Sequence, residues 1–155
     1  GPLCNPAKVK YQAMGIFNSD FLEKQIKVLF ELGLKSAMVF HGEDGLDEIT
    51  TTTNTKVFQF INRGEINCYE INPNELEMPL SNLSDLKGGS PKENAQIILR
   101  ILKNEKGPKR DIVILNAAAG IFISGKSKSL KEGISLARKS LDSGSAYEAL
   151  LKIQS

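Results

Sequence analysis

The sequence predicts an α/β fold in which helices flank a central, mostly parallel sheet. Three observations support this class. An amphipathic helical pattern leads into a short apolar run, two β-rich runs flank a turn signal, and the carboxy-terminal third contains several capped helical patterns. A helix followed directly by a buried strand is typical of parallel sheets, because their strands are covered on both faces.

The first elements can be assigned from apolar spacing and turn residues. Residues 1–18 carry two prolines near their start and predict a loop that runs into the apolar stretch 14–17. Asp20 and Glu23 form a capping-box pattern, and apolar residues then recur at helical spacing until Gly33, which favours a helix end.

The middle of the chain predicts strands and a long loop. Residues 36–40 are short and apolar, which indicates a buried strand. The β-rich runs 57–61 and 65–71 flank Asn-Arg-Gly at 62–64, which predicts a β-hairpin. Residues 72–91 are rich in Asn, Pro, Ser and Gly and predict a long loop.

Capping boxes predict the remaining helices. They are Ser90 with Glu93, Ser129 with Glu132, and Ser145 with Glu148. Segment 111–124 is apolar on every side, so its pattern alone fits a buried helix or a buried strand. Its length and its alanines favour the helix.

Composition excludes several functional classes. The 155 residues are 41% hydrophobic and 25% charged, and a chain of this size can bury one core. The 20 basic and 18 acidic residues nearly balance without a block of like charge, so we expect no nucleic-acid partner. The longest apolar run, 112–123, is too short to span a membrane. Two cysteines, Cys4 and Cys68, predict no disulfide framework and a reducing, cytoplasmic location.

An acidic loop directly follows the predicted strand 36–40. Residues 41–49 read His-Gly-Glu-Asp-Gly-Leu-Asp-Glu-Ile and place four carboxylates within six residues. Ligands of open α/β sheets bind at the carboxyl ends of strands, and crowded carboxylates there usually need a cation to offset their repulsion. Oxygen ligands of this kind favour magnesium, which one or two carboxylates, waters and substrate phosphates typically hold.

Other interpretations of the same residues stay open at this point. On local chemistry alone, a solvated acidic loop with glycine turns fits as well as a metal site. The ligand spacing of a calcium EF-hand is absent, and no cysteine lies at zinc-ligand spacing to His41, which favours a structural hydrogen bond for that side chain. Asn116 lies in an apolar segment and needs buried partners, so a structural hydrogen bond is favoured there too.

Two further loops are candidates for ligand contacts. The proline-rich loop 1–7 could wall an apolar pocket for a flat aromatic ligand, or it could be a rigid connector. Gly88 and Gly89 precede a predicted helix, where backbone amides could hold an anion. A simple junction between loop and helix is the favoured interpretation.

Five segments in matching order carry a family resemblance. They read Gly-Pro-Leu-Cys-Asn-Pro-Ala at 1–7, His-Gly-Glu-Asp-Gly-Leu-Asp-Glu-Ile-Thr at 41–50, Gly-Gly at 88–89 with Glu-Asn-Ala at 93–95, Leu-Asn-Ala-Ala-Ala at 115–119 and Asp-Ser-Gly-Ser-Ala at 142–146. In these segments the chain resembles the anthranilate phosphoribosyltransferases. The resemblance covers essentially the whole chain, and segment 41–50 is its most specific part.

The resemblance implies a fold and a domain assignment. Residues 1–155 would form the carboxy-terminal part of the catalytic domain shared by nucleoside phosphorylases and phosphoribosyltransferases. Family members extend further at the amino end, with a helical dimerisation region and a glycine-rich diphosphate loop of the form Gly-Thr-Gly-Gly-Asp, which these residues lack. We therefore expect this chain alone to be inactive and the complete protein to be a homodimer.

The resemblance also implies an activity. The family transfers the phosphoribosyl group of phosphoribosyl pyrophosphate (PRPP) to the amine of anthranilate, with release of pyrophosphate, in tryptophan biosynthesis. By this resemblance Mg²⁺ is the cofactor, Asp47 and Glu48 are metal ligands, and Asp44 is a weaker outer-shell candidate. Gly1 and Pro2 would line the entry path of anthranilate. No side chain is assigned as a catalytic base, because an aniline amine is already unprotonated near neutral pH.

Two alternative functions remain for a chain of this fold. A non-catalytic relative would bind nucleic acid; the near-neutral charge and the acidic loop count against it, and a salt-dependent shift with single-stranded DNA would favour it. A pyrimidine nucleoside phosphorylase would use phosphate at the same ribosyl carbon. The loop 1–7 favours the transferase, and assays with each substrate pair would decide.

Overall fold

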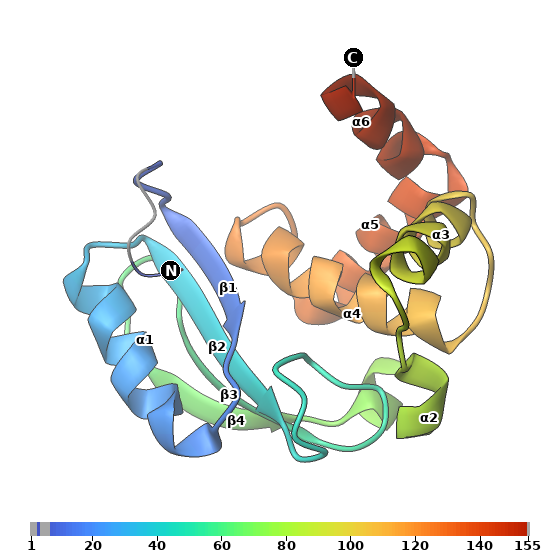
Figure 1. Ribbon diagram of the computed structural model, residues 1–155. Coiled ribbons are helices and arrows are strands. Elements are labelled where there is room, and N and C mark those ends of the chain that lie inside the picture. The colour runs from blue at the N-terminus through green and yellow to red at the C-terminus, as the bar shows by residue number, and fades with distance from the viewer. Residues whose placement is uncertain (1–2, 4–6, 155) are drawn as a thin grey trace.

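The computed structural model describes residue 3 and residues 7–154, and it contains a four-stranded sheet with helices on both faces (Figure 1). The strands, in spatial order, are β1 (Tyr11–Gly15), β2 (Ser36–Gly42), β3 (Thr55–Phe60) and β4 (Asn67–Ile71). Helix α1 (Leu22–Glu31) covers one face and helix α4 (Pro108–Ile123) packs on the other. The predicted α/β class is confirmed.

The sheet is mixed rather than mostly parallel. Strands β1 and β2 are parallel because helix α1 connects them by a crossover, whereas β3 is antiparallel to both of its neighbours. The reason is that the loop between β2 and β3 and the turn between β3 and β4 each reverse the chain. The predicted hairpin is confirmed, and its turn holds Asn62 and Arg63 at positive φ, as tight hairpin turns favour.

The amino-terminal part of the chain differs from the prediction in two places. Strand β1 lies inside the segment predicted to be a loop. This segment forms a strand because it pairs with β2, and its own sequence does not predict that pairing. The Asn18 side chain, and not a box between Asp20 and Glu23, caps the helical segment by accepting the Asp20 N–H at 2.8 Å. A 3₁₀ turn (Ser19–Phe21) then leads into α1.

The helical part of the chain largely follows the prediction. Helices α3 (Pro91–Leu102), α5 (Leu130–Asp142) and α6 (Ser145–Gln154) begin at the predicted positions, and α4 settles the ambiguous segment as a helix. The predicted long loop contains a 3₁₀ turn (Pro73–Leu76) and the one-turn helix α2 (Leu83–Leu86). Within the described residues, no helix is both long and apolar enough to cross a bilayer.

Alternation along β2 divides the core between the two faces. Ala37 and Val39 pack with α1, whereas Met38 and Phe40 pack with α4. Strand β2 is therefore the buried centre of the sheet. The carboxyl ends of β1 and β2 point in the same direction, so the loops that follow them meet at one edge.

Candidate functional site

The acidic loop leaves the carboxyl end of β2, beside the carboxyl end of β1 (Figure 1). This is the location that the sequence predicts for it. Four carboxylates lie on this loop, but the structure gives them different surroundings. Glu43, Asp47 and Glu48 are exposed, whereas Asp44 is partly buried.

Asp44 braces the loop from inside. Its carboxylate accepts hydrogen bonds from Thr50 Oγ1 at 2.6 Å, from Thr52 Oγ1, and from the Leu46 N–H at 3.0 Å. Partial burial raises the pKa of Asp44, but these hydrogen bonds together outweigh burial and hold the pKa below its ordinary value. Asp44, the predicted outer-shell metal candidate, thus uses both carboxylate oxygens for hydrogen bonds within the loop.

Asp47 and Glu48 form an outward-facing acid pair. Protein atoms around the Glu48 carboxyl group desolvate it, and the neighbouring Asp47 charge adds repulsion, so the pKa of Glu48 lies above its ordinary value. Both effects disfavour a second negative charge at this position. A bound cation would reverse both, because it stabilises the ionised carboxylates.

Gly15, at the end of β1, lies directly against the backbone of the acid pair. A Cβ atom at Gly15 would sit 1.6 Å from the Asp47 carbonyl oxygen and 2.4 Å from its carbonyl carbon. Only glycine permits this approach, and the backbone of Asp47 has no flexible end that could move aside. An isolated glycine in a strand is a signal of such close contact, but the sequence does not say which segment makes it.

Asn116, on helix α4, holds the other side of the acid pair. Its Oδ1 accepts the Ile49 N–H at 2.9 Å, and its Nδ2 donates to the Ile49 carbonyl at 2.9 Å. The structural hydrogen bond predicted for this asparagine is confirmed. Its partner, 67 residues away, could not be read from the sequence.

His41 has the structural role that the sequence favours. Its Nδ1 lies 2.7 Å from the carbonyl oxygen of Ile16, and since a carbonyl only accepts, Nδ1–H is the donor. This bond joins the ends of β1 and β2. It leaves the histidine as a link between two strands rather than as the centre of a metal site.

The donor chemistry of the acid pair fits a hard divalent cation with few protein ligands. In residues 3 and 7–154, no group of three or more His, Cys, Asp or Glu side chains could enclose a metal. A closed zinc or calcium cage is therefore not formed by this part of the chain. Two adjacent carboxylates suit magnesium, whose remaining ligands are usually water and phosphate oxygens.

A hollow of about 480 Å³ opens beside the acid pair. Glu48 and Asn116 contribute its polar groups, and the rest of its wall is mostly apolar: Leu46, Leu86, Ile112, Val113 and Ala117. The hollow brings the acidic loop and helix α4 to one surface. The predicted substrate contacts Gly1 and Pro2 lie outside the described residues.

The second candidate loop, at Gly88 and Gly89, is occupied by its own helix. The Gly89 N–H donates to Asn94 Oδ1 at 2.8 Å, and the Ser90 N–H donates to Glu93 Oε2 at 2.7 Å. Amides that are engaged in this way are not offered to an anion. The loop is the simple junction with a helix that the sequence favours.

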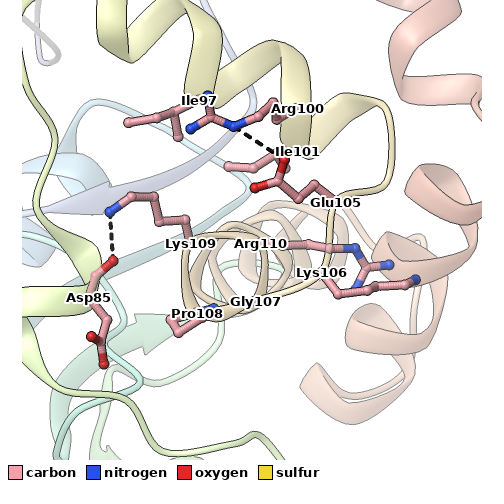
Figure 2. A pocket seen from close by; sticks show the side chains of 10 residues that line it. All are labelled: Asp85, Ile97, Arg100, Ile101, Glu105, Lys106, Gly107, Pro108, Lys109 and Arg110. Atoms are coloured by element: carbon pink, nitrogen blue, oxygen red, sulfur yellow. Dashed lines mark hydrogen bonds and ion pairs between the residues drawn. The ribbon is translucent and has the colours of Figure 1, made fainter.

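A separate hollow of about 190 Å³ lies at the start of α4 (Figure 2). Basic residues line it, but they are already engaged. Lys109 Nζ donates to the carbonyl oxygens of Asp85 and Lys87 at 2.6 Å, and Arg100 lies 3.2 Å from Glu105. The Lys109 contacts tie α2 to α4, the Arg100 pair ties α3 to the loop before α4, and together they leave little free positive charge for a ligand.

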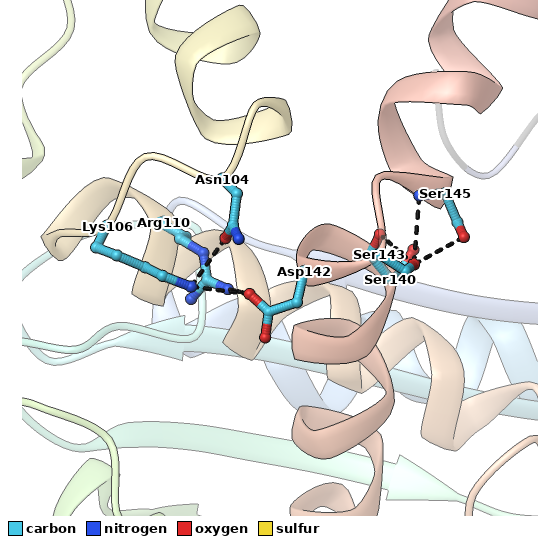
Figure 3. A network of polar contacts seen from close by, with 7 residues as sticks. All are labelled: Asn104, Lys106, Arg110, Ser140, Asp142, Ser143 and Ser145. Atoms are coloured by element: carbon cyan, nitrogen blue, oxygen red, sulfur yellow. Dashed lines mark hydrogen bonds and ion pairs between the residues drawn. The ribbon is translucent and has the colours of Figure 1, made fainter.

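A polar network joins the start of α4 to the end of α5 (Figure 3). The buried Arg110 and the exposed Lys106 both lie 2.8 Å from Asp142 Oδ1. The hydrogen bond from Lys106 is the largest of the causes that hold the pKa of Asp142 below its ordinary value. The network is structural, since it fixes the helix that carries Asn116.

Comparisons with known proteins agree with this arrangement. The anthranilate phosphoribosyltransferase of Caldanaerobacter subterraneus subsp. tengcongensis is 49% identical over 153 residues, which are 99% of this chain and 45% of that protein. That of Clostridium beijerinckii is 44% identical over 155 residues, which are 100% of this chain and 45% of that protein. The chain thus spans less than half the length of these curated relatives.

Solved structures show the same fold. The crystal structure of anthranilate phosphoribosyltransferase from Thermus thermophilus matches 98% of this chain and 44% of that chain, with a TM-score of 0.90 and 40% identity. The Saccharomyces cerevisiae enzyme in complex with PRPP and Mg matches 97% of this chain and 43% of that chain, with a TM-score of 0.85 and 24% identity. At that identity the likeness concerns the fold alone.

The extent of one family match decides the classification. Residues 1–147 match the family described as glycosyl transferase family, a/b domain. The match includes the acidic loop, Gly15 and Asn116 as well as most of the helical part. This chain therefore belongs to the glycosyl transferase family, a/b domain.

Proposed function

We propose that this chain is the carboxy-terminal part of the catalytic domain, residues 1–155, of an anthranilate phosphoribosyltransferase. The observation that carries the proposal is the outward-facing pair Asp47 and Glu48, at the carboxyl ends of two parallel strands. The names of the relatives support the same activity. Because the chain spans about 45% of those relatives, the activity is proposed for the whole protein, and this chain alone is expected to be inactive.

Asp47 and Glu48 are the residues that would hold Mg²⁺ in this protein. The yeast relative that contains PRPP and Mg supports this choice of ion. When bound, the ion neutralises charge that develops on the departing pyrophosphate oxygens. The chain's own contribution is to present two ionised carboxylates in a fixed orientation, while Asp44 and the threonines keep the loop closed.

The amine of anthranilate, which is the acceptor, needs little help from a general base of the protein. The anthranilate amine attacks the anomeric carbon of the ribose, the bond to the pyrophosphate oxygen breaks, and the nitrogen loses a proton. We place Gly1 and Pro2 at the entry path of this acceptor. The proposal also includes a cytoplasmic location and a homodimer for the complete protein.

The test is a double substitution in the intact protein, Asp47→Asn with Glu48→Gln. Turnover should fall about 100-fold or more, because the developing charge on the leaving group loses its metal, while binding of anthranilate should change little. Turnover and the KM for each substrate are measured across a magnesium titration. Glu43→Gln, an exposed carboxylate on the same loop, is the matched control and should keep wild-type turnover.

Two outcomes contradict the proposal. If the double variant keeps wild-type turnover at limiting magnesium, Asp47 and Glu48 are not the metal ligands. A fall equal to that of Glu43→Gln would mean that loop charge in general, and not this pair, sets the rate.

A further inference from the structure

We propose that Asn116 is a positioning residue that orients the acid pair for its metal. This inference rests on the proposed metal site and adds a residue that never touches the ion. Asn116 lies on helix α4, which is remote in sequence from the acidic loop. Its amide binds both backbone groups of Ile49, the residue that follows Glu48.

The orientation of the Asn116 amide is unambiguous. Nδ2 donates to two carbonyl oxygens, those of Ile49 at 2.9 Å and Ile112 at 3.0 Å, while Oδ1 accepts the Ile49 N–H. A flipped amide would set its oxygen against two other oxygens and its NH₂ group against an N–H. The bond to Ile112, four residues earlier in α4, locks the side chain against its own helix.

The bond to Ile49 fixes one peptide plane of Glu48. The Ile49 N–H belongs to the peptide that joins Glu48 to Ile49, so holding it restricts the ψ angle of Glu48. The Ile49 side chain is fully buried among residues of α4 and the sheet, which anchors the same point from the other direction. The end of the acid pair is thus held by both backbone and side chain.

The preceding peptide plane is confined by β1. The Asp47 carbonyl, part of the peptide that joins Asp47 to Glu48, lies against the Cβ-free face of Gly15. Restraint of this plane restricts the φ angle of Glu48. With both flanking planes restrained, the direction of the Glu48 Cα–Cβ bond follows from the positions of β1 and α4.

This restraint matters because the two acids repel each other. Without a cation, two adjacent ionised carboxylates repel each other and are favoured to turn apart. A loosened backbone would let them separate, and the ion would then have to order the loop as it binds. Residues that orient metal ligands typically change metal affinity by about 10- to 100-fold when they are substituted.

The experiment compares two asparagines in the intact protein. Asn116→Leu keeps the branched side-chain skeleton with the same number of heavy atoms but removes the amide. Asn94→Leu is the matched control, because Asn94 binds both backbone groups of Gly89 in the same way, away from the acid pair. The readouts are the magnesium concentration for half-maximal turnover, kcat at saturating magnesium, direct Mg²⁺ titration by calorimetry, and hydrogen exchange of the Ile49 amide.

The proposal expects a split between these readouts. Asn116→Leu should raise the half-maximal magnesium concentration about 10-fold, speed Ile49 exchange and largely recover kcat at saturating magnesium. Asn94→Leu should leave the magnesium dependence unchanged. A purely structural role would instead lower kcat at every magnesium concentration without moving the half-maximal point.

The proposal is overturned if Ile49 exchange accelerates while the magnesium dependence stays within twofold of wild type. If Asn116→Leu does not fold, Asn116→Ser replaces it, because a serine hydroxyl can still bond to the Ile112 carbonyl but is too short to reach Ile49. Failure here is distinct from failure of the metal site. If only the positioning role of Asn116 is wrong, the double variant at Asp47 and Glu48 still loses turnover. If the metal site itself is wrong, the double variant keeps its turnover.

Discussion

The acidic loop (residues 41–50) and the glycine loop before α3 (Gly88 and Gly89) are each held by an asparagine side chain. The two asparagines differ in how far along the chain they lie from the loop residue that they bind. In each, a helical asparagine binds the N–H and the carbonyl of one loop residue: Asn116 binds Ile49, and Asn94 binds Gly89. The separations are 67 and 5 residues. The glycine loop is therefore a local extension of its helix, whereas the acidic loop depends on the packing of α4 against the sheet.

The glycine that contacts the acidic loop, Gly15, and the glycine of the other loop, Gly89, also differ in which atoms surround them. A Cβ atom at Gly15 would overlap the Asp47 backbone, whereas a Cβ atom at Gly89 would meet the end of the Glu93 side chain at 2.5 Å. A flexible side chain can turn away, but a backbone fixed by β1, α4 and the core cannot. The comparison teaches that a loop held by distant elements tolerates less change than a loop held by its neighbours.

The largest effect should separate these two glycines. Gly15→Ala should destabilise the protein by about 1–3 kcal/mol and lower turnover at limiting magnesium about 100-fold, because Asp47 must move. Gly89→Ala should have little effect on either quantity. Chemical denaturation and magnesium-dependent turnover measure both. Equal effects of the two substitutions would break the comparison.

The next effect concerns stability alone and should separate the carboxylate in each loop that accepts backbone and hydroxyl hydrogen bonds, Asp44 and Glu93. Asp44→Ala should lower the free energy of unfolding at neutral pH by about 1–3 kcal/mol, because Thr50 and Thr52 lose their acceptor. Glu93→Ala, which removes only an exposed cap on Ser90, should lower it much less. Urea denaturation of both variants measures the difference.

The pH dependence of the Asp44 effect has a defined sign. The pKa of Asp44 is lowered in the folded protein, so its stabilising contribution is present above the ordinary value of 3.8 and is lost as the pH falls through the folded value. The difference between wild type and Asp44→Ala should therefore shrink in acid. A difference that stays constant down to acidic pH would assign the effect to packing rather than to the charge.

The smallest effect concerns Glu48 itself. Its pKa is raised above the ordinary value of 4.5, so the ionised form is disfavoured in the folded protein, and stability is lost as the pH rises through the folded value. Glu48→Gln should raise the Tm by about 1–2 °C at neutral pH without metal, and the gain should vanish in acid. At saturating magnesium, the wild type should have the higher Tm of the two. Calorimetry with and without magnesium measures this, and a lower Tm at neutral pH would contradict it.

Patterns that depend on neighbouring residues were predictable from the sequence. The capping box at Ser90 and the end of α1 at Gly33, with its φ of +83°, follow from local chemistry. The hairpin around Asn62 and Arg63 is equally local. The position of the acidic loop followed from the general rule that strand ends carry sites.

Features that depend on distant partners were not predictable. Strand β1 is short and partly exposed, and only pairing with β2 makes it a strand. The run of threonines gave no hint that Thr50 and Thr52 close on Asp44. Asn116 signalled a buried partner by its apolar surroundings, but only the packing of α4 identifies that partner as Ile49.

The distribution of these restraints limits how the acidic segment can be reused. Grafting residues 41–50 onto another scaffold would carry the carboxylates and the internal threonine contacts, but not Gly15 or Asn116. A chimera built that way would contain the motif, but on a loop whose backbone conformation is not restrained by β1 and α4. The smallest transferable unit comprises three separate stretches of the chain, together with the sheet and helix that hold them in register.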